Sequence, residues 1–348
     1  MSSDPRSDGF RMPPEWETHA RCWMAWPSRD DLWGKHIEEV RENYADIAKA
    51  IARFEPVTMI ANPDHMADIS LKCGSGVACL PVEHDDSWIR DNGPSFVMNA
   101  IGRIMGVRWD FNGWGERFLP YDLDAAVPDA VLDHLRISRY TPGLVTEGGA
   151  FHTDGEGTLV AVEPSIVNDN RNPGKSREEI EDILLRHTGT DRMIWLPYGL
   201  AGDHTDGHVD NVCCFIRPGA VAVLACDNED DENYERLNAN RQALEAAVDA
   251  QGRELEIIQV PQPRARYNDK GERLPLSYIN FYAPNGGLIL PAFEDPADDR
   301  AHKVLAGAFK GRDVIQLPVL DILQGGGGIH CITLQQPKFM SPGSESGA

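Results

Sequence analysis

Residues 31–61 decide the class of fold. The stretch DLWGKHIEEVRENYADIAKAIARF at 31–54 is followed, after two residues, by VTMIA at 57–61. The first part carries apolar residues at helical spacing, and the second is an apolar run with the length of a buried strand. The stretch therefore predicts a helix that leads into a buried β-strand.

The same order recurs along the chain. Further helices, each followed by a strand, are expected at 124–135 and 144–149, 176–187 and 193–197, 236–251 and 256–261, and 298–310 and 314–320. After each of these strands comes a polar cluster and another strand, expected at 95–98, 157–163, 211–216, 277–282 and 330–334. No unit of this kind can bury its apolar face alone, so the five units predict an α/β repeat architecture closed on itself. In a closed ring the polar clusters would converge at one end of the axis.

Composition limits the function classes. The chain has 348 residues, of which 41% are hydrophobic, and a net charge of −22. This charge argues against nucleic acid or an anionic membrane as a partner, and it suits both solubility and a cationic small molecule. No apolar stretch approaches the roughly 20 residues of a membrane helix. We expect a soluble protein.

The cysteines and the chain ends bear on location and domain organisation. Seven cysteines, without a CxxC pair, argue against a disulfide scaffold and fit reduced thiols in a cytoplasm. The start, MSSDPRSDGF, lacks the pattern of a signal peptide. Residues 1–9 and 341–348 are polar, small-residue stretches that we expect to be flexible tails. Residues 10–340 contain no long linker and are expected to form a single domain.

The stretch QGGGGIHCITLQQP at 324–337 places four glycines just before Cys331. Glycine is used where the backbone adopts unusual dihedrals or approaches another group closely. The stretch is consistent with a flexible loop before a buried cysteine. It is equally consistent with a nucleophilic thiol whose substrate packs against bare backbone.

The cluster DDSWIRDNGP at 85–94 brings Asp85, Asp86 and Asp91 close to Trp88. In isolation such a stretch is typical of a solvated acidic turn. An aromatic ring among three carboxylates would also hold a planar cation by ring stacking and paired hydrogen bonds.

In EGGAFHTDGEG at 147–157, Glu147 precedes two glycines. This glutamate is either a residue of a hairpin bulge or a second carboxylate presented into a tight site.

The cluster DHTDGHVDN at 203–211 holds His204, His208 and Asp210 next to an apolar strand. Two histidines four residues apart and an aspartate could bind a metal ion if they shared a helix face. Gly207 and the strand-like flank argue against a helix. On a strand, His208 and Asp210 would point the same way, which suits a histidine acid/base beside a carboxylate.

Together, one thiol, one histidine and several carboxylates suit nucleophilic attack on a cationic carbon. The thiolate is the nucleophile, and a positive neighbour such as a bound guanidinium favours its formation. Carboxylates that clamp the guanidinium would hold its carbon close to sulfur. The histidine would then donate a proton to departing ammonia and activate water.

These motifs resemble those of the agmatine deiminases and of the Porphyromonas-type peptidyl-arginine deiminases, which form one family. The resemblance runs in order from MPPEWETHARCWMAWP at 12–27 through DDSWIRDNGPSFV, EGGAFHTDGEGT, NDNRNPG at 168–174, GHVDN and SYINFYAPNGG at 277–287 to GIHCITLQQP. It thus covers nearly the whole chain.

The resemblance implies a five-module, pseudo-fivefold α/β propeller of the guanidine-modifying type. It also implies roles for individual residues. Cys331 matches the nucleophile, His208 and Asp210 match the catalytic GHVD pair, and Asp91 and Glu147 match the carboxylates that grip the guanidinium. Trp88 matches a residue that lines the pocket, and we expect Asp85 to help bind the substrate.

We therefore expect hydrolysis of agmatine, a step in putrescine biosynthesis, to N-carbamoylputrescine and ammonia through an amidino-cysteine. No cofactor and no metal are expected, and a homo-oligomer is left open. Two departures from the family pattern, His204 in DHTDGH and the absence of an arginine before the glycine run, concern the far end of the substrate. The alternatives are a deiminase of arginine or peptidyl-arginine, a metal-dependent hydrolase that uses His204, His208 and Asp210, and a non-catalytic polyamine-binding module.

Overall fold

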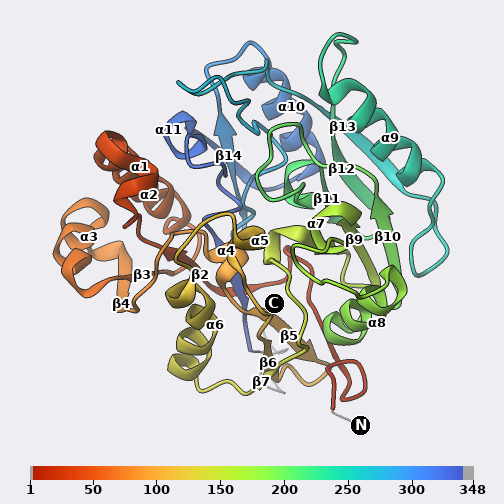
Figure 1. Ribbon diagram of the computed structural model, residues 1–348, viewed down its shortest axis with the longest axis horizontal. Coiled ribbons are helices and arrows are strands. Elements are labelled where there is room, and N and C mark those ends of the chain that lie inside the picture. The colour runs from red at the N-terminus through yellow and green to blue at the C-terminus, as the bar shows by residue number, and fades with distance from the viewer. Residues whose placement is uncertain (1–2, 340–348) are drawn as a thin grey trace.

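The computed structural model describes residues 3–339, and the strands of this part form five separate sheets (Figure 1). The first sheet contains β16 (Leu334–Pro337), β2 (His19–Ala25), β3 (Val57–Ala61) and β4 (Val77–Pro81). The second contains β1 (Phe10–Arg11), β5 (Ser95–Asn99), β6 (Ile104–Val107) and β7 (Arg139–Tyr140). The third contains β10 (Arg192–Leu196), β9 (Thr158–Val162) and β8 (Phe151–Thr153). The fourth contains β11 (Cys213–Arg217), β12 (Ala220–Ala225) and β13 (Glu256–Pro261), and the fifth β14 (Gly287–Ala292) and β15 (Asp313–Pro318).

The sheets share one connection pattern. In the second, third and fourth sheets an antiparallel pair is followed by a helix and by a strand that pairs in parallel with the second strand of the pair. In the fifth sheet the antiparallel pair is reduced to a single bridge between Tyr282 and Ile289. In the first sheet β16 takes the place of the opening strand, antiparallel to β2, and β3 follows in parallel. The fold is therefore mixed α/β, with a repeated unit of two strands, a helix and a strand.

The connecting helices lie on the outside of the molecule in chain order (Figure 1). They are α2 (Ile37–Ile51), α6 (Asp122–Leu135), α8 (Arg177–Thr188), α9 (Asn233–Glu245) and α10 (Asp298–Ala308). The remaining helices are α1 (Asp30–Trp33), α3 (Met66–Cys73), α4 (Ile89–Asn92), α5 (Gly113–Glu116), α7 (Glu163–Ile166) and α11 (Leu320–Leu323). Among the described residues no helix is both long enough and apolar enough to cross a membrane.

Local sequence explains where these helices begin and which face they bury. α8 begins at Ser176, whose side chain accepts from the Glu179 N–H while the Glu179 side chain accepts from the Ser176 N–H. This capping box satisfies two N–H groups that would otherwise lack partners. In α2, Val40, Tyr44, Ile47 and Ile51 follow the helical repeat and are buried.

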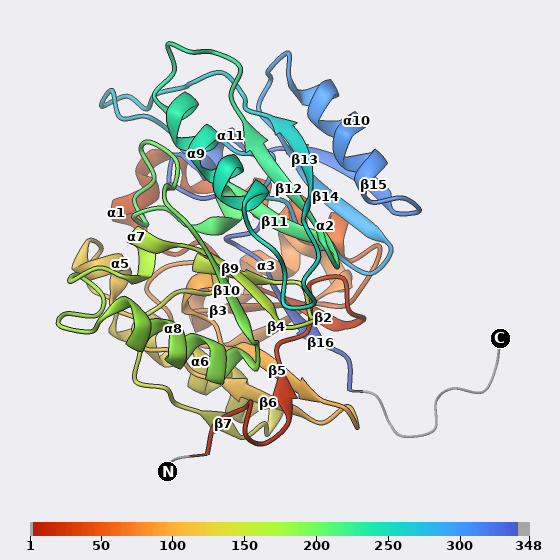
Figure 2. The same ribbon diagram turned by 90° about the vertical axis from the view of Figure 1, so that its right-hand side faces the viewer.

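The pairing of β16 with β2 joins distant parts of the chain, and Figure 2 shows the two strands together. Residues 3–9, predicted as part of a tail, contact the second and third units. The Arg6 N–H donates to the Arg186 carbonyl at 3.0 Å, and the Tyr140 hydroxyl donates to Asp8 at 2.7 Å. The other predicted tail, 341–348, lies outside the described residues.

Two predicted strands are wrong for a common reason. At 144–149, Val145 makes only an isolated bridge, because its N–H and carbonyl are both bonded by the Asn172 side chain. At 277–282, the Ile279 N–H donates to the Ser277 hydroxyl, and only Tyr282 pairs with a strand. In both places a side chain forms hydrogen bonds with backbone groups that would otherwise pair with a neighbouring strand. The strand predicted at 330–334 begins only at Leu334, which leaves Cys331 in a turn.

Candidate active site

The candidate site is a cavity lined by residues from several of the units. Its lining includes Asp86, Trp88, Asp91, Trp114, His208 and Cys331. Asp91, His208 and Cys331 each lie a few residues before the first strand of an antiparallel pair, in the second, fourth and first sheets. The repeated unit thus brings together polar loops that are far apart in sequence.

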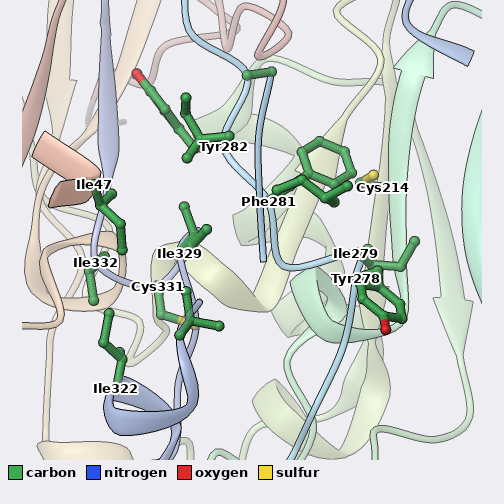
Figure 3. Packing of buried hydrophobic residues seen from close by; sticks show 14 of the residues in the cluster. Ile47, Cys214, Tyr278, Ile279, Phe281, Tyr282, Ile322, Ile329, Cys331 and Ile332 are labelled. Carbon is green, nitrogen blue, oxygen red and sulfur yellow. The ribbon is translucent and has the colours of Figure 1, made fainter. Parts of the chain in front are cut away.

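The glycine run before Cys331 allows three close approaches. A Cβ atom on Gly327 would lie 2.5 Å from the Trp88 ring, and one on Gly328 would lie 2.6 Å from Asn280 Oδ1. A Cβ on Gly325 would collide with the Trp33 ring. The glycines are therefore required by packing, and the loop they form is not a flexible linker. Figure 3 shows Cys331 at the end of this loop, next to the buried side chains of Ile329 and Ile332.

Cys331 is 5% exposed, and its thiol contacts the side chains of Asp210 and Asn280 and the backbone of Gly328. Its Sγ atom lies 3.7 Å from Asp210 Oδ2 and 3.2 Å from Asn280 Nδ2. Burial, together with the negative charges of Asp210 and Asp91, raises the pKa of the thiol well above its ordinary value. Cys331 is therefore a thiol, and Asp210 Oδ2 and Asn280 Oδ1 both lie within hydrogen-bond distance of its Sγ.

His208 is buried between two carboxylates. Its Nε2 lies 3.3 Å from Glu147 Oε2, and its Nδ1 lies 3.5 Å from Asp91 Oδ1. Burial disfavours the charged imidazolium, but the charge of Asp91 and the hydrogen bond to Glu147 outweigh this effect and raise the pKa of His208 to about 10. His208 is thus protonated at neutral pH. Gly149 permits this arrangement, since a Cβ there would lie 2.7 Å from His208 Nδ1.

The strand geometry predicted for His208 and Asp210 is wrong. Val209–Asn211 form a single 3-10 turn, and the two side chains have different partners. Asp210 Oδ2 lies 2.8 Å from His330 Nδ1, and His330 Nε2 in turn lies 2.8 Å from Glu15 Oε1. Both residues nevertheless border the same thiol, His208 through the cavity and Asp210 by direct contact.

Asp91 faces the cavity from α4. Its Oδ2 accepts the Trp114 indole N–H at 2.9 Å, and its Oδ1 accepts the Gly149 N–H at 3.1 Å. Burial raises the pKa of this carboxyl to about 6, even though the neighbouring His208 acts in the opposite direction. A carboxylate in this state gains more from a cationic ligand than a solvated one does.

Glu147 lies behind the cavity wall. It is fully buried, and its Oε1 accepts the Arg171 Nε–H at 2.8 Å. Burial raises the pKa of a carboxyl, but the Arg171 charge outweighs it and lowers the pKa of Glu147 below its ordinary value. The immediate role of its other oxygen is to hold His208.

Asp85 and Asp86, the two acidic residues before Trp88, make different contacts. The Asp85 carboxylate accepts the Leu123 N–H at 3.0 Å at the start of α6, and Asp85 is absent from the cavity lining. Asp86 lines the cavity and is 1% exposed, its Oδ2 has no hydrogen-bond partner, and Arg29 lies 3.9 Å away. Burial raises the pKa of Asp86 to about 7. Trp88 lines the cavity, as predicted, with its ring 5.7 Å from that of Trp33.

Several residues of the site were not assigned a role from the sequence. Asn280 contacts the thiol, Trp114 contacts Asp91, and His330 links Asp210 to Glu15. Asn280 and His330 lie inside motifs quoted above, SYINFY and GIHC, and each comes just before an opening strand position. That repeated position is the signal by which Asn280 could have been found.

His204 also lines the cavity, but its contacts differ from those of His208. Its carbonyl accepts from Arg117, and its ring lies 6.1 Å from that of Phe118. Within residues 3–339 no three His, Cys, Asp or Glu side chains are grouped so that they could hold a metal ion.

Comparisons with known proteins cover almost the whole chain. The sequence profile of the Porphyromonas-type peptidyl-arginine deiminases matches residues 11–337. The agmatine deiminase of Stutzerimonas stutzeri is 42% identical over 360 residues, covering 97% of this chain and 98% of that protein. The agmatine deiminase of Pseudomonas aeruginosa is 42% identical over 359 residues with the same coverage.

A solved structure agrees with these sequence matches. The agmatine deiminase of Enterococcus faecalis superposes with a TM-score of 0.94 at 32% identity, covering 98% of this chain and 99% of that one. Fold, sequence and the grouped polar side chains thus lead to the same assignment. The chain belongs to the Porphyromonas-type peptidyl-arginine deiminase family, and the relatives named here are agmatine deiminases.

Proposed function

We propose that this protein hydrolyses agmatine to N-carbamoylputrescine and ammonia. One observation carries the proposal: the Cys331 thiol shares one cavity with the carboxylate of Asp91, the imidazolium of His208 and the rings of Trp88 and Trp114. A flat cation fits between the rings, and the carboxylate meets its N–H groups. The 42% identity to agmatine deiminases supports the same reaction.

Cys331 is the nucleophile. The approach of a guanidinium places a positive charge beside sulfur and offsets the negative charges of Asp210 and Asp91, which favours the thiolate. Asp210, whose carboxylate lies 3.7 Å from sulfur, takes the thiol proton. Sulfur then bonds to the guanidinium carbon and forms a tetrahedral intermediate.

His208 moves the remaining protons. It donates its proton to the departing nitrogen, the C–N bond breaks, and ammonia leaves an amidino group on Cys331. Neutral His208 then takes a proton from water as the oxygen bonds to the same carbon. The added hydroxyl then loses its remaining proton to solvent as the carbonyl forms, and breakage of the C–S bond releases N-carbamoylputrescine and restores the thiolate. Asp91 binds the guanidinium, and Glu147 holds His208 in place and adds negative charge beside the bound cation.

The far ammonium of the substrate meets Asp86. This assignment replaces the one for Asp85, whose carboxylate is engaged at the start of α6. The unpartnered Oδ2 of Asp86 is supplied with a donor when an ammonium enters the cavity. An arginine would place a carboxylate near the same group, so agmatine is preferred over free arginine.

The five units form a pseudo-fivefold α/β propeller. Five separate sheets, a shared order of two strands, helix and strand, and helices on the outside in chain order support this arrangement (Figure 1). A cytoplasmic location is also part of the proposal. All seven cysteines lie in the described part of the chain and are free thiols, which supports a reducing compartment.

Ammonia release from agmatine, free arginine and a peptidyl-arginine tests the proposal. We expect kcat/KM for agmatine to exceed that for the other two compounds by at least about 100-fold, because only agmatine lacks a carboxylate or amide next to the far nitrogen. Comparable values for agmatine and arginine would contradict it and identify a different deiminase. Activity that is lost on prolonged chelation and returns with zinc would favour the metal-dependent alternative.

A further inference from the structure

Asn280 belongs to the fifth unit, which places neither a carboxylate nor the thiol at the site. Asp91, Glu147, Asp210 and Cys331 precede the opening strand positions of four sheets. In the fifth sheet the opening position is Tyr282, which bridges to β14, and Asn280 precedes it. Asn280 is 2% exposed. The repeat therefore places a buried neutral amide where the other units place a carboxylate or the thiol.

The orientation of the Asn280 amide follows from neighbours whose role in a hydrogen bond, donor or acceptor, is fixed. The His330 backbone N–H lies 2.9 Å from Asn280 Oδ1 and can only donate, so the oxygen must face it. The amide nitrogen therefore takes the other position, 3.0 Å from Asn211 Oδ1 and 3.2 Å from Cys331 Sγ, while Oδ1 also lies 3.5 Å from Cys331 Sγ. Asn211 is fixed in the same manner, because its own nitrogen donates to the Asp203 carboxylate at 3.1 Å. The NH₂ group thus has one hydrogen for Asn211 and one for sulfur.

The charges around sulfur explain why a neutral donor is useful there. The charged and titratable groups around Cys331 are Tyr44, Asp86, Arg90, Asp91, His204, His208, Asp210 and His330. The carboxylates attract a cationic substrate but oppose a negative charge on sulfur. A lysine or arginine in direct contact with sulfur would favour the thiolate, yet it would repel the guanidinium. An amide N–H stabilises the thiolate without adding charge.

We infer that Asn280 is a catalytic residue that donates a hydrogen bond to the Cys331 thiolate. The inference rests on the proposed function for its role in turnover. The bond acts twice in the reaction: it favours the attacking thiolate, and it stabilises the same thiolate as it leaves when the C–S bond breaks. In the amidino intermediate sulfur is neutral and gains less from the donor.

The test measures the ionisation of Cys331 directly and needs no substrate. Substrate-free enzyme is alkylated with iodoacetamide between about pH 7 and 10, and the modified Cys331 peptide is quantified by mass spectrometry. A hydrogen bond to a charged group predicts that Asn280→Leu slows alkylation at a given pH about 10- to 100-fold and shifts the profile upward by about one to two pH units. Asn280→Asp keeps the acceptor for His330 but loses the donor, so it should shift in the same direction.

Ser277→Ala is the matched control. Ser277 is 1% exposed and shapes the same turn through the Ile279 N–H, without contacting sulfur. Its alkylation profile should match that of the unaltered enzyme. A profile of Asn280→Leu or Asn280→Asp equal to that of the unaltered enzyme would overturn the inference. So would a shift in Ser277→Ala as large as that in Asn280→Leu, because a distorted turn would then explain both.

Thermal unfolding and steady-state kinetics complete the test. Thermal unfolding identifies a variant that does not fold, and Asn280→Asp then decides, since the backbone carbonyl and the side-chain oxygen at position 280 still accept from His330. In turnover, kcat should fall while KM for agmatine changes little, whereas a change in KM alone would contradict the inference. An enzyme that alkylates as expected but releases no ammonia from agmatine would instead refute the proposed function.

Discussion

Two buried polar clusters of this molecule have similar ingredients and different chemistry. The His19 cluster contains His19, Glu55, Tyr282 and Asn285. Tyr282 donates to Glu55 at 2.6 Å, the Asn285 N–H donates to it at 2.8 Å, and His19 Nδ1 lies at 3.0 Å. Both oxygens of Glu55 are therefore engaged. This cluster joins the first and fifth units as a satisfied network.

The Cys331 cluster contains Asp86, Asp91, His208, Asp210 and Cys331. Here Asp86 Oδ2 and Asp210 Oδ1 are buried without a hydrogen-bond partner, and four of the five residues, all except Asp210, line the cavity. An unsatisfied buried oxygen costs free energy unless a ligand supplies a donor. The comparison teaches that burial and residue type do not separate a structural network from an active site, whereas unsatisfied oxygens on a cavity do.

The largest effect should come from Cys331→Ser. We expect kcat to fall by more than about 10³-fold, because a hydroxyl is a far poorer nucleophile than a thiolate near neutral pH. The melting temperature should change little. Mass spectrometry of quenched turnover by the unaltered enzyme should show an amidino adduct on the Cys331 peptide. An adduct on Cys22 or Cys226 would place the nucleophile outside the Cys331 cluster.

His208 should rank second. His208→Ala removes the proton transfers, and we expect a fall in kcat of about 10²–10⁴-fold. His204→Ala should lower kcat less than about tenfold, since His204 lines the cavity but lies outside the network of Asp91 and Glu147. Steady-state assays of the two variants compare them directly. Equal and complete loss in both would support a metal site.

The dependence of kcat/KM on pH should show the protonation of Asp91. Its pKa is raised to about 6, so kcat/KM should fall as the pH drops through that value and the carboxylate takes up a proton. On the alkaline side activity should fall as His208 loses its proton near pH 10. In Asp91→Asn, kcat/KM should be low at every pH and the limb near pH 6 should disappear, while a limb near pH 7, where Asp86 takes up a proton, should remain. An unchanged limb near pH 6 in this variant would assign that limb to another group.

A smaller effect is expected at the far end of the cavity. Asp86→Asn should raise KM for agmatine about tenfold or more, because a charge-assisted hydrogen bond to the ammonium is lost. Asp85→Asn is the matched control: it should leave KM nearly unchanged and instead lower the free energy of unfolding by about 0.5–2 kcal/mol through the start of α6. The reverse pattern would restore the sequence-based assignment of Asp85.

The smallest effect on catalysis should come from the His19 cluster. Glu55→Gln should lower the free energy of unfolding by about 1–3 kcal/mol, as measured by urea titration, because partners of the carboxylate lose an acceptor. The kcat/KM of the folded fraction should stay within about twofold of that of the unaltered enzyme. A large loss of kcat/KM at full folding would remove the distinction between the two clusters.

The sequence predicts those elements whose determinants are local. The strand at 57–61 and the strand at 256–261 are confirmed at their predicted bounds, because each is a short apolar run between turn residues. The helix at 176–187 is confirmed to within one residue, since its capping box lies in the sequence itself. The strands at 144–149 and 277–282 are wrong because Asn172 and Ser277 take their backbone groups. A periodicity pattern contains no information about such side chains.

For the candidate site too, the sequence predicts only those features whose determinants are local. Motifs led to Cys331, His208, Asp91 and Trp88, and the structure places all four on one cavity. Which of two adjacent carboxylates faces that cavity depends on the backbone between them, so Asp85 and Asp86 could not be separated by residue type. The partner of Glu147 is Arg171, 24 residues further along the chain, and the partner of the thiol is Asn280, which belongs to another unit. Contacts of this kind become visible only in three dimensions.

The pairing of β16 with β2 has a consequence for biosynthesis. Cys331 and β16 follow every other unit in the chain, and the sheet that begins with β2 lacks its β16 strand until 334–337 leave the ribosome. The carboxylates and the histidine of the site are all synthesised earlier. During translation the nascent chain therefore carries the carboxylates and the histidine before it carries the nucleophile, and activity appears only after Cys331 and β16 have been synthesised. A ribosome-stalled chain that ends before 330 should release no ammonia, however well its earlier units have folded.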